Sequence, residues 1–157
     1  MIAFDGDKAG INYIRYPIGD FPDNIFYRGL VYDQLDCIDT SADGTRILVG
    51  AKTQDPVDPD LFHHRFYLLD ANYLGSIKTY TSHGNPDSLN SVPTLVKISD
   101  NKKVFISVDE NNYIETWGVE EGDHQGSYHF GTGVTAVAIS PDGTKMAAGV
   151  DASSHNG

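Results

Sequence analysis

The chain has 157 residues, which is enough for one domain with a substantial core but hardly for two. Hydrophobic residues make up 39% of it, no apolar run approaches the length of a membrane span, and the first ten residues lack the apolar stretch of a secretory signal. The formal net charge is −11, from 11 basic and 22 acidic residues. Because nucleic acids are bound mainly by basic side chains, this charge argues against a nucleic-acid partner, and no membrane partner is expected.

The acidic surplus allows two interpretations: a solvated surface that resists self-association, or a face that attracts a basic partner. The single cysteine, Cys37, excludes an internal disulfide framework and fits a reducing compartment. It lies in an alternating apolar run, so we expect a small buried core residue rather than a nucleophile. These features predict an intracellular, cytoplasmic protein.

The pattern of apolar runs and turn residues in the first half of the chain predicts seven short strands. Three of them lie within residues 1–31, in the segments MIAF, INYIRYPI and NIFYRGLV. A hairpin follows, in which two apolar runs of residues 35–51 flank Asp43–Gly44, a dipeptide typical of tight hairpin turns. Two further strands are expected at Arg65–Asp70 and Gly75–Thr81.

Residues 53–65 (TQDPVDPDLFHHR) form an insertion between two of these strands. Its acids and histidines are metal-ligand types, but their spacing does not match a calcium loop, and adjacent histidines on an extended strand point to opposite faces. We expect either a Pro-stiffened connection or a contact with a partner protein, because loops carry recognition and this one holds an apolar pair. The candidate partner-binding residues are Asp55, Asp58, Asp60, Leu61, Phe62, His63 and His64.

The second half of the chain predicts six more strands. A weaker copy of the hairpin covers residues 94–108, where DNKK replaces the Asp-Gly turn, and strands are expected at Tyr113–Gly118 and Gly126–Gly131. The last hairpin, residues 134–150, has its turn at Asp142–Gly143. The histidines around the fourth of these strands, His124 and His129, are expected to belong to a polar turn rather than to a metal site.

The three hairpins are copies of one pattern. Residues 35–51 match residues 134–150 at an offset of 99, with the weaker copy between them. The serines that precede the turns, Ser41, Ser99 and Ser140, are 58 and 41 residues apart, and the longer interval contains the insertion. Four short strands in about 40 residues are the strand number and period of a β-propeller blade.

The chain resembles the WD-repeat β-propeller family in a degenerate form. The family's Trp-Asp pair at the end of the third strand appears as Leu69–Asp70 in the first full repeat and as Trp117–Gly118 in the second. The resemblance implies that Trp117 is the family's packed tryptophan rather than an exposed binding aromatic. The turn at residues 140–143 reads SPDG, which is typical of the family. The family's Gly-His pair before the first strand is missing, so its buried His–Ser–Asp–Trp hydrogen-bond network is not assumed.

The resemblance implies an all-β fold of β-propeller blades, each of four antiparallel strands, in an incomplete ring of two full and two partial blades. The expected blades are the partial blade 1–31, the full blades 35–82 and 92–131, and the partial blade 134–157. Ile38, Val96 and Val137 are expected to be equivalent core residues. Because ring closure takes about four or more blades, we expect a segment of a longer propeller, whose terminal blades are covered by the remainder of the propeller or by a neighbouring subunit.

Two functions are compatible with this fold. The first is a non-catalytic protein–protein interaction scaffold without cofactor or metal; the resemblance places such proteins in cytoskeletal, ciliary and axonemal assemblies. The second is a propeller-type enzyme, in which polar residues of several blades converge on a central channel. The first strands of the three copies present Asp36 and Asp39, then Lys97, then Thr135 and Ala138, so no acid or histidine repeats at matching positions. The sequence therefore predicts the scaffold, with other proteins as partners.

Overall fold

The computed structural model describes residues 4–5, 8–14, 25–32, 34–54, 57–58, 62–72, 75–81 and 91–151. These residues form thirteen β-strands in four antiparallel sheets, and no helix occurs among them. No helix in this part of the chain is therefore long and apolar enough to cross a membrane. The predicted all-β architecture of four-stranded antiparallel sheets is confirmed.

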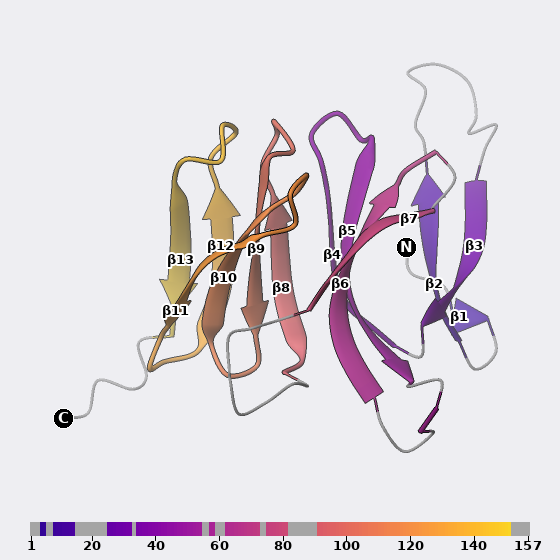
Figure 1. Ribbon diagram of the computed structural model, residues 1–157, viewed down its shortest axis with the longest axis horizontal. Helices are drawn as coiled ribbons and strands as arrows, with labels where there is room; N and C mark the ends of the chain where they lie inside the picture. The colour runs from indigo at the N-terminus through magenta and orange to yellow at the C-terminus, as the bar shows by residue number, and fades with distance from the viewer. Residues whose placement is uncertain are drawn as a thin grey trace.

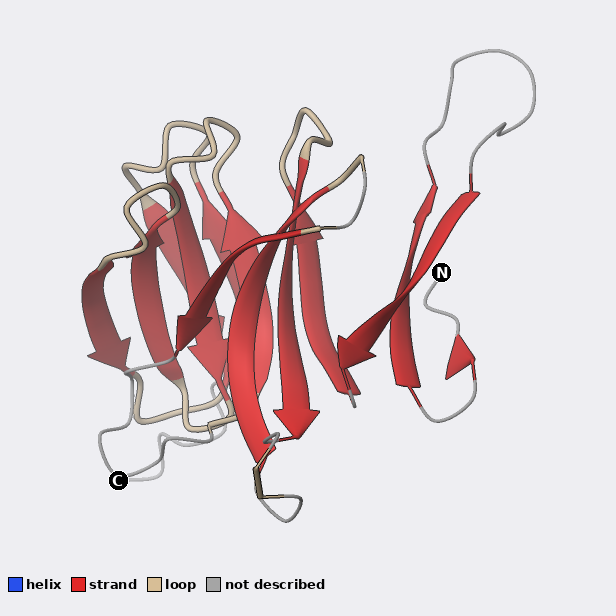
Figure 2. Ribbon diagram, turned by 45° about the vertical axis from the view of Figure 1, so that its right-hand side comes forward, coloured by secondary structure: helices blue, strands red, loops and turns tan. Residues whose placement is uncertain are grey.

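Two of the sheets have four strands and two are smaller. The leading sheet has the order β1–β2–β3, the first full sheet β4–β5–β6–β7, the second full sheet β8–β9–β10–β11, and the terminal sheet consists of β12 and β13. The strands are β1 (Phe4–Asp5), β2 (Lys8–Ile14), β3 (Ile25–Tyr32), β4 (Gln34–Thr40), β5 (Arg46–Gln54), β6 (Phe62–Asp70), β7 (Ser76–Thr81), β8 (Pro93–Ile98), β9 (Val104–Asp109), β10 (Tyr113–Gly118), β11 (His124–His129), β12 (Val134–Ile139) and β13 (Met146–Val150). Figure 1 shows the leading and terminal sheets at opposite ends, with the full sheets between them, and Figure 2 shows the same order from another side.

The three hairpin turns are held by the same hydrogen bonds, which explains the repeated pattern in the sequence. In the first turn, the Ser41 hydroxyl donates to Asp43 (Oγ–Oδ1 2.7 Å) and accepts from the backbone N–H of Arg46 (3.0 Å). Gly44 donates its N–H to the Ser41 carbonyl (2.8 Å) and has a φ of 66°, in the left-handed region that favours glycine. The equivalent residues are Ser99, Asn101 and Lys102 in the second turn, and Ser140, Asp142 and Gly143 in the third.

The carboxylates of the first and third turns, Asp43 and Asp142, should make the free energy of unfolding depend on pH in the acid range. Hydrogen bonds hold the pKa of the Asp43 carboxyl well below its ordinary value of 3.8, and the bond from Lys102 is the largest cause. The pKa of the Asp142 carboxyl is also lowered, mainly by the hydrogen bond from Ser140. A carboxyl whose pKa is lowered by folding stabilises the fold fully above its unfolded pKa. That contribution is lost as the pH falls from the unfolded pKa through the folded one.

We expect the free energy of unfolding to fall as the pH drops below about 4, and the double variant Asp43→Asn/Asp142→Asn to lose much of that dependence. The variant should still fold at neutral pH, because the second turn already uses an asparagine, Asn101, whose Oδ1 accepts the bond from Ser99 Oγ (2.7 Å). Urea unfolding between roughly pH 3 and pH 6 measures the dependence for both proteins. Equal slopes in this range would show that other groups cause the acid sensitivity.

Side chains alternate along the strands of the first full sheet, so the sheet has an apolar cluster on each face. One cluster faces the leading sheet and consists of Ile47, Val49, Ala51, Tyr67, Leu69 and Ala71. The other, the interblade core, joins the two full sheets. It consists of Leu48, Phe66, Leu68 and Tyr80 from the first sheet and of Val96, Ile98, Phe105, Trp117 and Val119 from the second.

Trp117 lies at the centre of the interblade core. Its ring stacks on Phe105 with a centroid distance of 5.9 Å and meets the Tyr80 ring edge-on at 5.9 Å. The side chain is 2% exposed, and its indole N–H donates to the buried Ser107 hydroxyl (3.2 Å). The predicted packed tryptophan is confirmed.

The expected equivalence of Ile38, Val96 and Val137 as core residues is wrong for Ile38. Val96 is 3% exposed because it packs against the first full sheet, whereas Ile38 is 39% exposed. Ile38 pairs with Val49, so it lies on the face toward the three-stranded leading sheet. Val137 is half-buried in the two-stranded terminal sheet. Burial therefore depends on the neighbouring sheet and not on the repeated position alone.

Truncating these two residues should give different results. Val96→Ala removes two buried methyl groups and should lower the free energy of unfolding by roughly 1–3 kcal/mol, whereas Ile38→Ala should cost less than half as much despite losing more atoms. Urea unfolding of the two variants at low temperature measures both changes. A larger loss for Ile38→Ala would place its side chain in the core after all.

Candidate functional site

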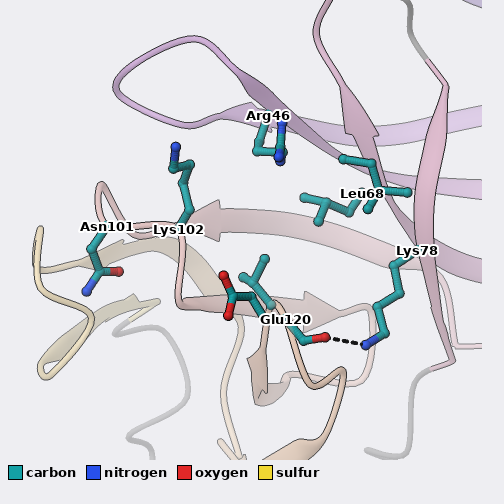
Figure 3. A pocket seen from close by; sticks show the side chains of 8 residues that line it. Arg46, Leu68, Lys78, Asn101, Lys102 and Glu120 are labelled. Carbon is teal, nitrogen blue, oxygen red and sulfur yellow. Dashed lines mark hydrogen bonds between the residues drawn. The ribbon is translucent and has the colours of Figure 1, made fainter.

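A groove lies between the two full sheets, where strand ends and turns from both meet. It has a volume of about 550 Å³. The lining residues are Arg46, Leu68, Ile77, Lys78, Asn101, Lys102, Val119 and Glu120. Figure 3 shows the labelled side chains surrounding one space, with Arg46, Leu68 and Lys78 from the first sheet and the others from the second.

The floor of the groove is apolar. Leu68 and Val119 belong to the interblade core, and Ile77 is 48% exposed above them. Below the floor, the Tyr80 hydroxyl donates to the Val119 carbonyl (2.7 Å), and burial raises the pKa of Tyr80 to about 12. The phenol therefore stays neutral at physiological pH and joins the two sheets.

Basic side chains form the rim of the groove. Lys78 Nζ donates to the Glu120 carbonyl (2.7 Å), which Figure 3 shows as a dashed line. Arg46 Nη1 lies 3.2 Å from Asp70 Oδ2, and Lys102 forms an ion pair with Asp43 across the two sheets (Nζ–Oδ2 2.6 Å). The side chains of Arg46 and Lys102 are each about one-third exposed, so both remain in contact with solvent.

The arrangement of the lining suits the binding of a peptide. No serine, cysteine or histidine occurs among the described residues that line the groove. An apolar floor with three cations at its rim can accommodate an extended peptide, with an apolar side chain against Leu68 and a carboxylate near Arg46 or Lys102.

The structure extends two strands into the insertion of residues 53–65. β5 continues to Gln54 and β6 begins at Phe62, with Thr53 opposite His63 and Gln54 opposite Phe62 in the ladder. The two strands therefore reach into the insertion from both of its ends.

The candidate partner-binding residues divide into three groups. Asp55, Asp60 and Leu61 lie outside the described residues. Asp58 is exposed, and Phe62 is the first residue of β6. His63 and His64 are adjacent on the same strand, and partner binding by this segment stays a prediction.

His64 already has a partner within the first full sheet. Its Nδ1 lies 3.2 Å from Asp36 Oδ2, and the side chains are 9% and 4% exposed. Among the described residues, no group of three or more histidines, cysteines and acids lies close enough to hold a metal ion.

The other histidines and the cysteine also pack against neighbours. His124 Nε2 lies 3.5 Å from Glu115 Oε1, and His129 stacks on Tyr113 with a centroid distance of 4.5 Å, so the two histidines do not form one site. Cys37 packs against the interblade core, and burial raises its pKa to about 12, which keeps the thiol protonated at neutral pH.

The polar residues of the inner strands connect the sheets. Lys97 Nζ lies 2.8 Å from Asp39 Oδ1, and the other oxygen of Asp39 accepts from the Ile98 backbone N–H (2.9 Å). An ion pair therefore joins β4 and β8. It is formed by Asp39 and Lys97, two of the first-strand residues considered for a central channel.

The groove itself was not predicted from the sequence. In the sequence, Arg46 is recognised only as the first residue after a repeated turn. No motif or short spacing associates it with Lys78 or Glu120. Its lining comes from five separate segments that meet only when the two sheets pack, so the pattern of a single repeat does not indicate it.

Comparison with solved structures identifies a similar fold. The crystal structure of the Cps50 (Swd1) β-propeller domain from Myceliophteria thermophila matches with a TM-score of 0.57 at 14% sequence identity. The match covers 74% of this chain and 32% of that one, so this chain spans about a third of the length of the domain. No family model matches the chain, and no curated protein matches it. The likeness establishes the fold: a β-propeller with two four-stranded blades, flanked by two smaller sheets, in an incomplete ring.

Proposed function

We propose that this chain is a segment of a WD-repeat propeller that serves as a non-catalytic scaffold for protein–protein interaction. The observation that carries the proposal is the groove between the two full sheets, with its apolar floor and cationic rim. The engagement of Asp36 and Asp39 in contacts within and between the sheets also favours a scaffold over a channel enzyme. The buried Trp117–Ser107 hydrogen bond supports the WD-repeat assignment.

The ligand of the groove would be an extended protein segment with an acidic residue near an apolar one. The groove concentrates three of the 11 basic residues of a chain whose net charge is −11, so this surface differs in charge from the chain as a whole. A cytoplasmic setting within a cytoskeletal or ciliary assembly belongs to the same proposal and rests on the family resemblance.

A peptide library displayed on phage tests the groove. Selected peptides should carry Asp or Glu beside an apolar residue, and they should lose binding about tenfold or more to the variant Arg46→Gln/Lys102→Asn. Asparagine suits position 102, because Lys102 has a φ of 59°. The matched control is Lys145→Gln, which changes the counterpart of Arg46 in the terminal sheet. Peptides without acids, or binding unaffected by the double variant, would contradict this site.

A further inference from the structure

Lys102 has a backbone conformation that is strained for a lysine. Its φ is 59°, in the left-handed region, and its N–H closes the second turn by donating to the Ser99 carbonyl (2.9 Å). Glycine occupies the equivalent position in the other two turns, at Gly44 (φ 66°) and Gly143 (φ 72°), and adopts this conformation without strain. The turn itself therefore favours glycine at position 102, and retained strain of this kind points to a function of the side chain.

The Lys102 side chain crosses from the second full sheet to the first. Its Nζ lies 2.6 Å from Asp43 Oδ2 and donates to Thr45 Oγ1 (3.3 Å). Figure 3 shows the side chain extending away from its own turn at the rim of the groove. A lysine ammonium group has three hydrogens, and these two contacts account for two of them. The position of this cation is thus set by the first turn of the opposite sheet.

The first turn does not need the ion pair with Lys102. Asp43 forms the turn with its other oxygen, Oδ1, which accepts from Ser41 Oγ (2.7 Å) and from the N–H and Oγ1 of Thr45 (3.1 and 2.8 Å). In the second turn an uncharged amide is sufficient, since Asn101 Oδ1 accepts the equivalent side-chain and backbone bonds (2.7 and 3.0 Å). The contact of Asp43 Oδ2 with Lys102 is therefore additional to the turn.

The other two basic side chains of the rim are held by partners on or beside their own strands or by a backbone carbonyl. Arg46 Nη1 donates to the Thr45 carbonyl (3.0 Å) and pairs with Asp70, whose side chain is only 16% exposed. Lys78 donates to the Glu120 carbonyl (2.7 Å). Neither cation depends on an open carboxylate of the opposite sheet.

The ion pair of Asp43 and Lys102 is open to solvent at both ends. The Asp43 side chain is 44% exposed and the Lys102 side chain 35% exposed. A carboxylate from a ligand can therefore reach the Lys102 ammonium group. Because exposed ion pairs contribute little to stability, exchanging one carboxylate for another on this lysine disturbs the fold little.

We propose that Lys102 binds the acidic side chain of the groove's ligand, and that Asp43 occupies Lys102 when the groove is empty. The ligand's carboxylate replaces Asp43 Oδ2 on the ammonium group, while Asp43 Oδ1 keeps its bonds within the turn. Binding is thereby self-inhibited, because each ligand displaces an acid that the chain itself supplies. This inference rests on the proposed function of the groove and adds its regulation.

Fluorescence anisotropy with the labelled peptide GSLDGS, which carries an acid beside a leucine, tests the competition at neutral pH and low temperature. Asp43→Asn should bind the peptide about fivefold more tightly than the unsubstituted residues 1–157, because Lys102 loses its internal carboxylate. Lys102→Gly should weaken binding several-fold. The peptide GSLNGS, which lacks the acid, should show neither effect.

Two controls separate competition for Lys102 from a general effect of charge. Asp142→Asn removes the same charge from the equivalent turn of the terminal sheet, and should leave the affinity for GSLDGS unchanged. The double variant Asp43→Asn/Lys102→Gly should bind no better than Lys102→Gly, since no lysine remains to be released. A gain from Asp43→Asn that persists without Lys102 would overturn the proposal.

The same titrations distinguish failure of this inference from failure of the proposed function. Equal affinity of Asp43→Asn and the unsubstituted chain, with GSLDGS bound by both, would overturn self-inhibition and leave the groove as a peptide site. Failure of GSLDGS to bind to either protein would contradict the proposed function, and this inference with it.

The stability of Lys102→Gly gives a readout that needs no peptide. Glycine fits a φ of 59°, so this variant should unfold at the same urea concentration as the unsubstituted chain or at a higher one. Lys102→Ala loses the same charge but keeps the backbone strain, and should unfold at a lower concentration than Lys102→Gly. A clear loss of stability in Lys102→Gly would show that the lysine serves the turn, and would overturn the proposal.

Discussion

Replacing Trp117 by alanine should lower the free energy of unfolding by about 3–5 kcal/mol, which is the range for large aromatic side chains removed from a core. The indole is 2% exposed and contacts rings from both full sheets, so its loss opens a cavity where the sheets meet. It also leaves the buried Ser107 hydroxyl without its donor. Urea unfolding at low temperature and low protein concentration measures the change.

Two further variants separate the causes. Trp117→Phe keeps most of the packing but loses the indole N–H, and should cost clearly less than Trp117→Ala. Tyr128→Ala removes an aromatic ring that is 61% exposed, and should change stability by less than about 1 kcal/mol. A loss below about 1 kcal/mol for Trp117→Ala would show that the full sheets do not pack around this residue.

Replacing Gly50 by alanine should cost about 3 kcal/mol, although alanine is normally the better strand residue. A Cβ at this position would lie 2.6 Å from Cys37 Sγ and 2.6 Å from Pro93 Cβ. Pro93 begins β8, so the added methyl group would separate the first and second full sheets as well as disturb β4. Its rigid ring cannot turn aside as a flexible side chain can.

Gly149 provides the matched control, because it is the equivalent glycine of the terminal sheet. A Cβ there would meet Ala136 Cβ at 3.5 Å, an ordinary contact. Gly149→Ala should therefore be neutral or slightly stabilising. Thermal or urea unfolding of both variants gives the comparison, and similar results for Gly50→Ala and Gly149→Ala would contradict the close approach of the two sheets.

Local pattern predicted the turns and most of the strands, but β11 runs from His124 to His129 and not over Gly126–Gly131, so both histidines lie in this strand rather than in a polar turn. The Ser-x-Asp-Gly turns form where expected because their hydrogen bonds join residues no more than five positions apart. β10 matches its predicted bounds, and Trp117 is packed as expected. β6 began earlier than predicted, at Phe62, because its ladder with β5 extends into the insertion.

Features that depend on how neighbouring sheets pack were not predicted. Ile38 occupies the same position in the repeat as Val96. It is nevertheless more exposed, because it faces the smaller leading sheet and Val96 faces a full sheet. The pair of Asp36 and His64 joins residues 28 positions apart on non-adjacent strands. These contacts arise only in the assembled stack, so the pattern of one repeat carries no information on them.

Sedimentation velocity combined with thermal melting of residues 1–157 tests most directly whether the chain is an incomplete ring that needs neighbours. Each blade of a propeller buries both faces against others, whereas the described residues of the terminal sheet form two strands, and Met146 and Tyr128 are exposed. We predict that the purified chain self-associates, aggregates or unfolds well below body temperature. A monomer that melts sharply above roughly 55 °C, in the usual range of intact mesophilic domains, would show that these residues form a complete fold.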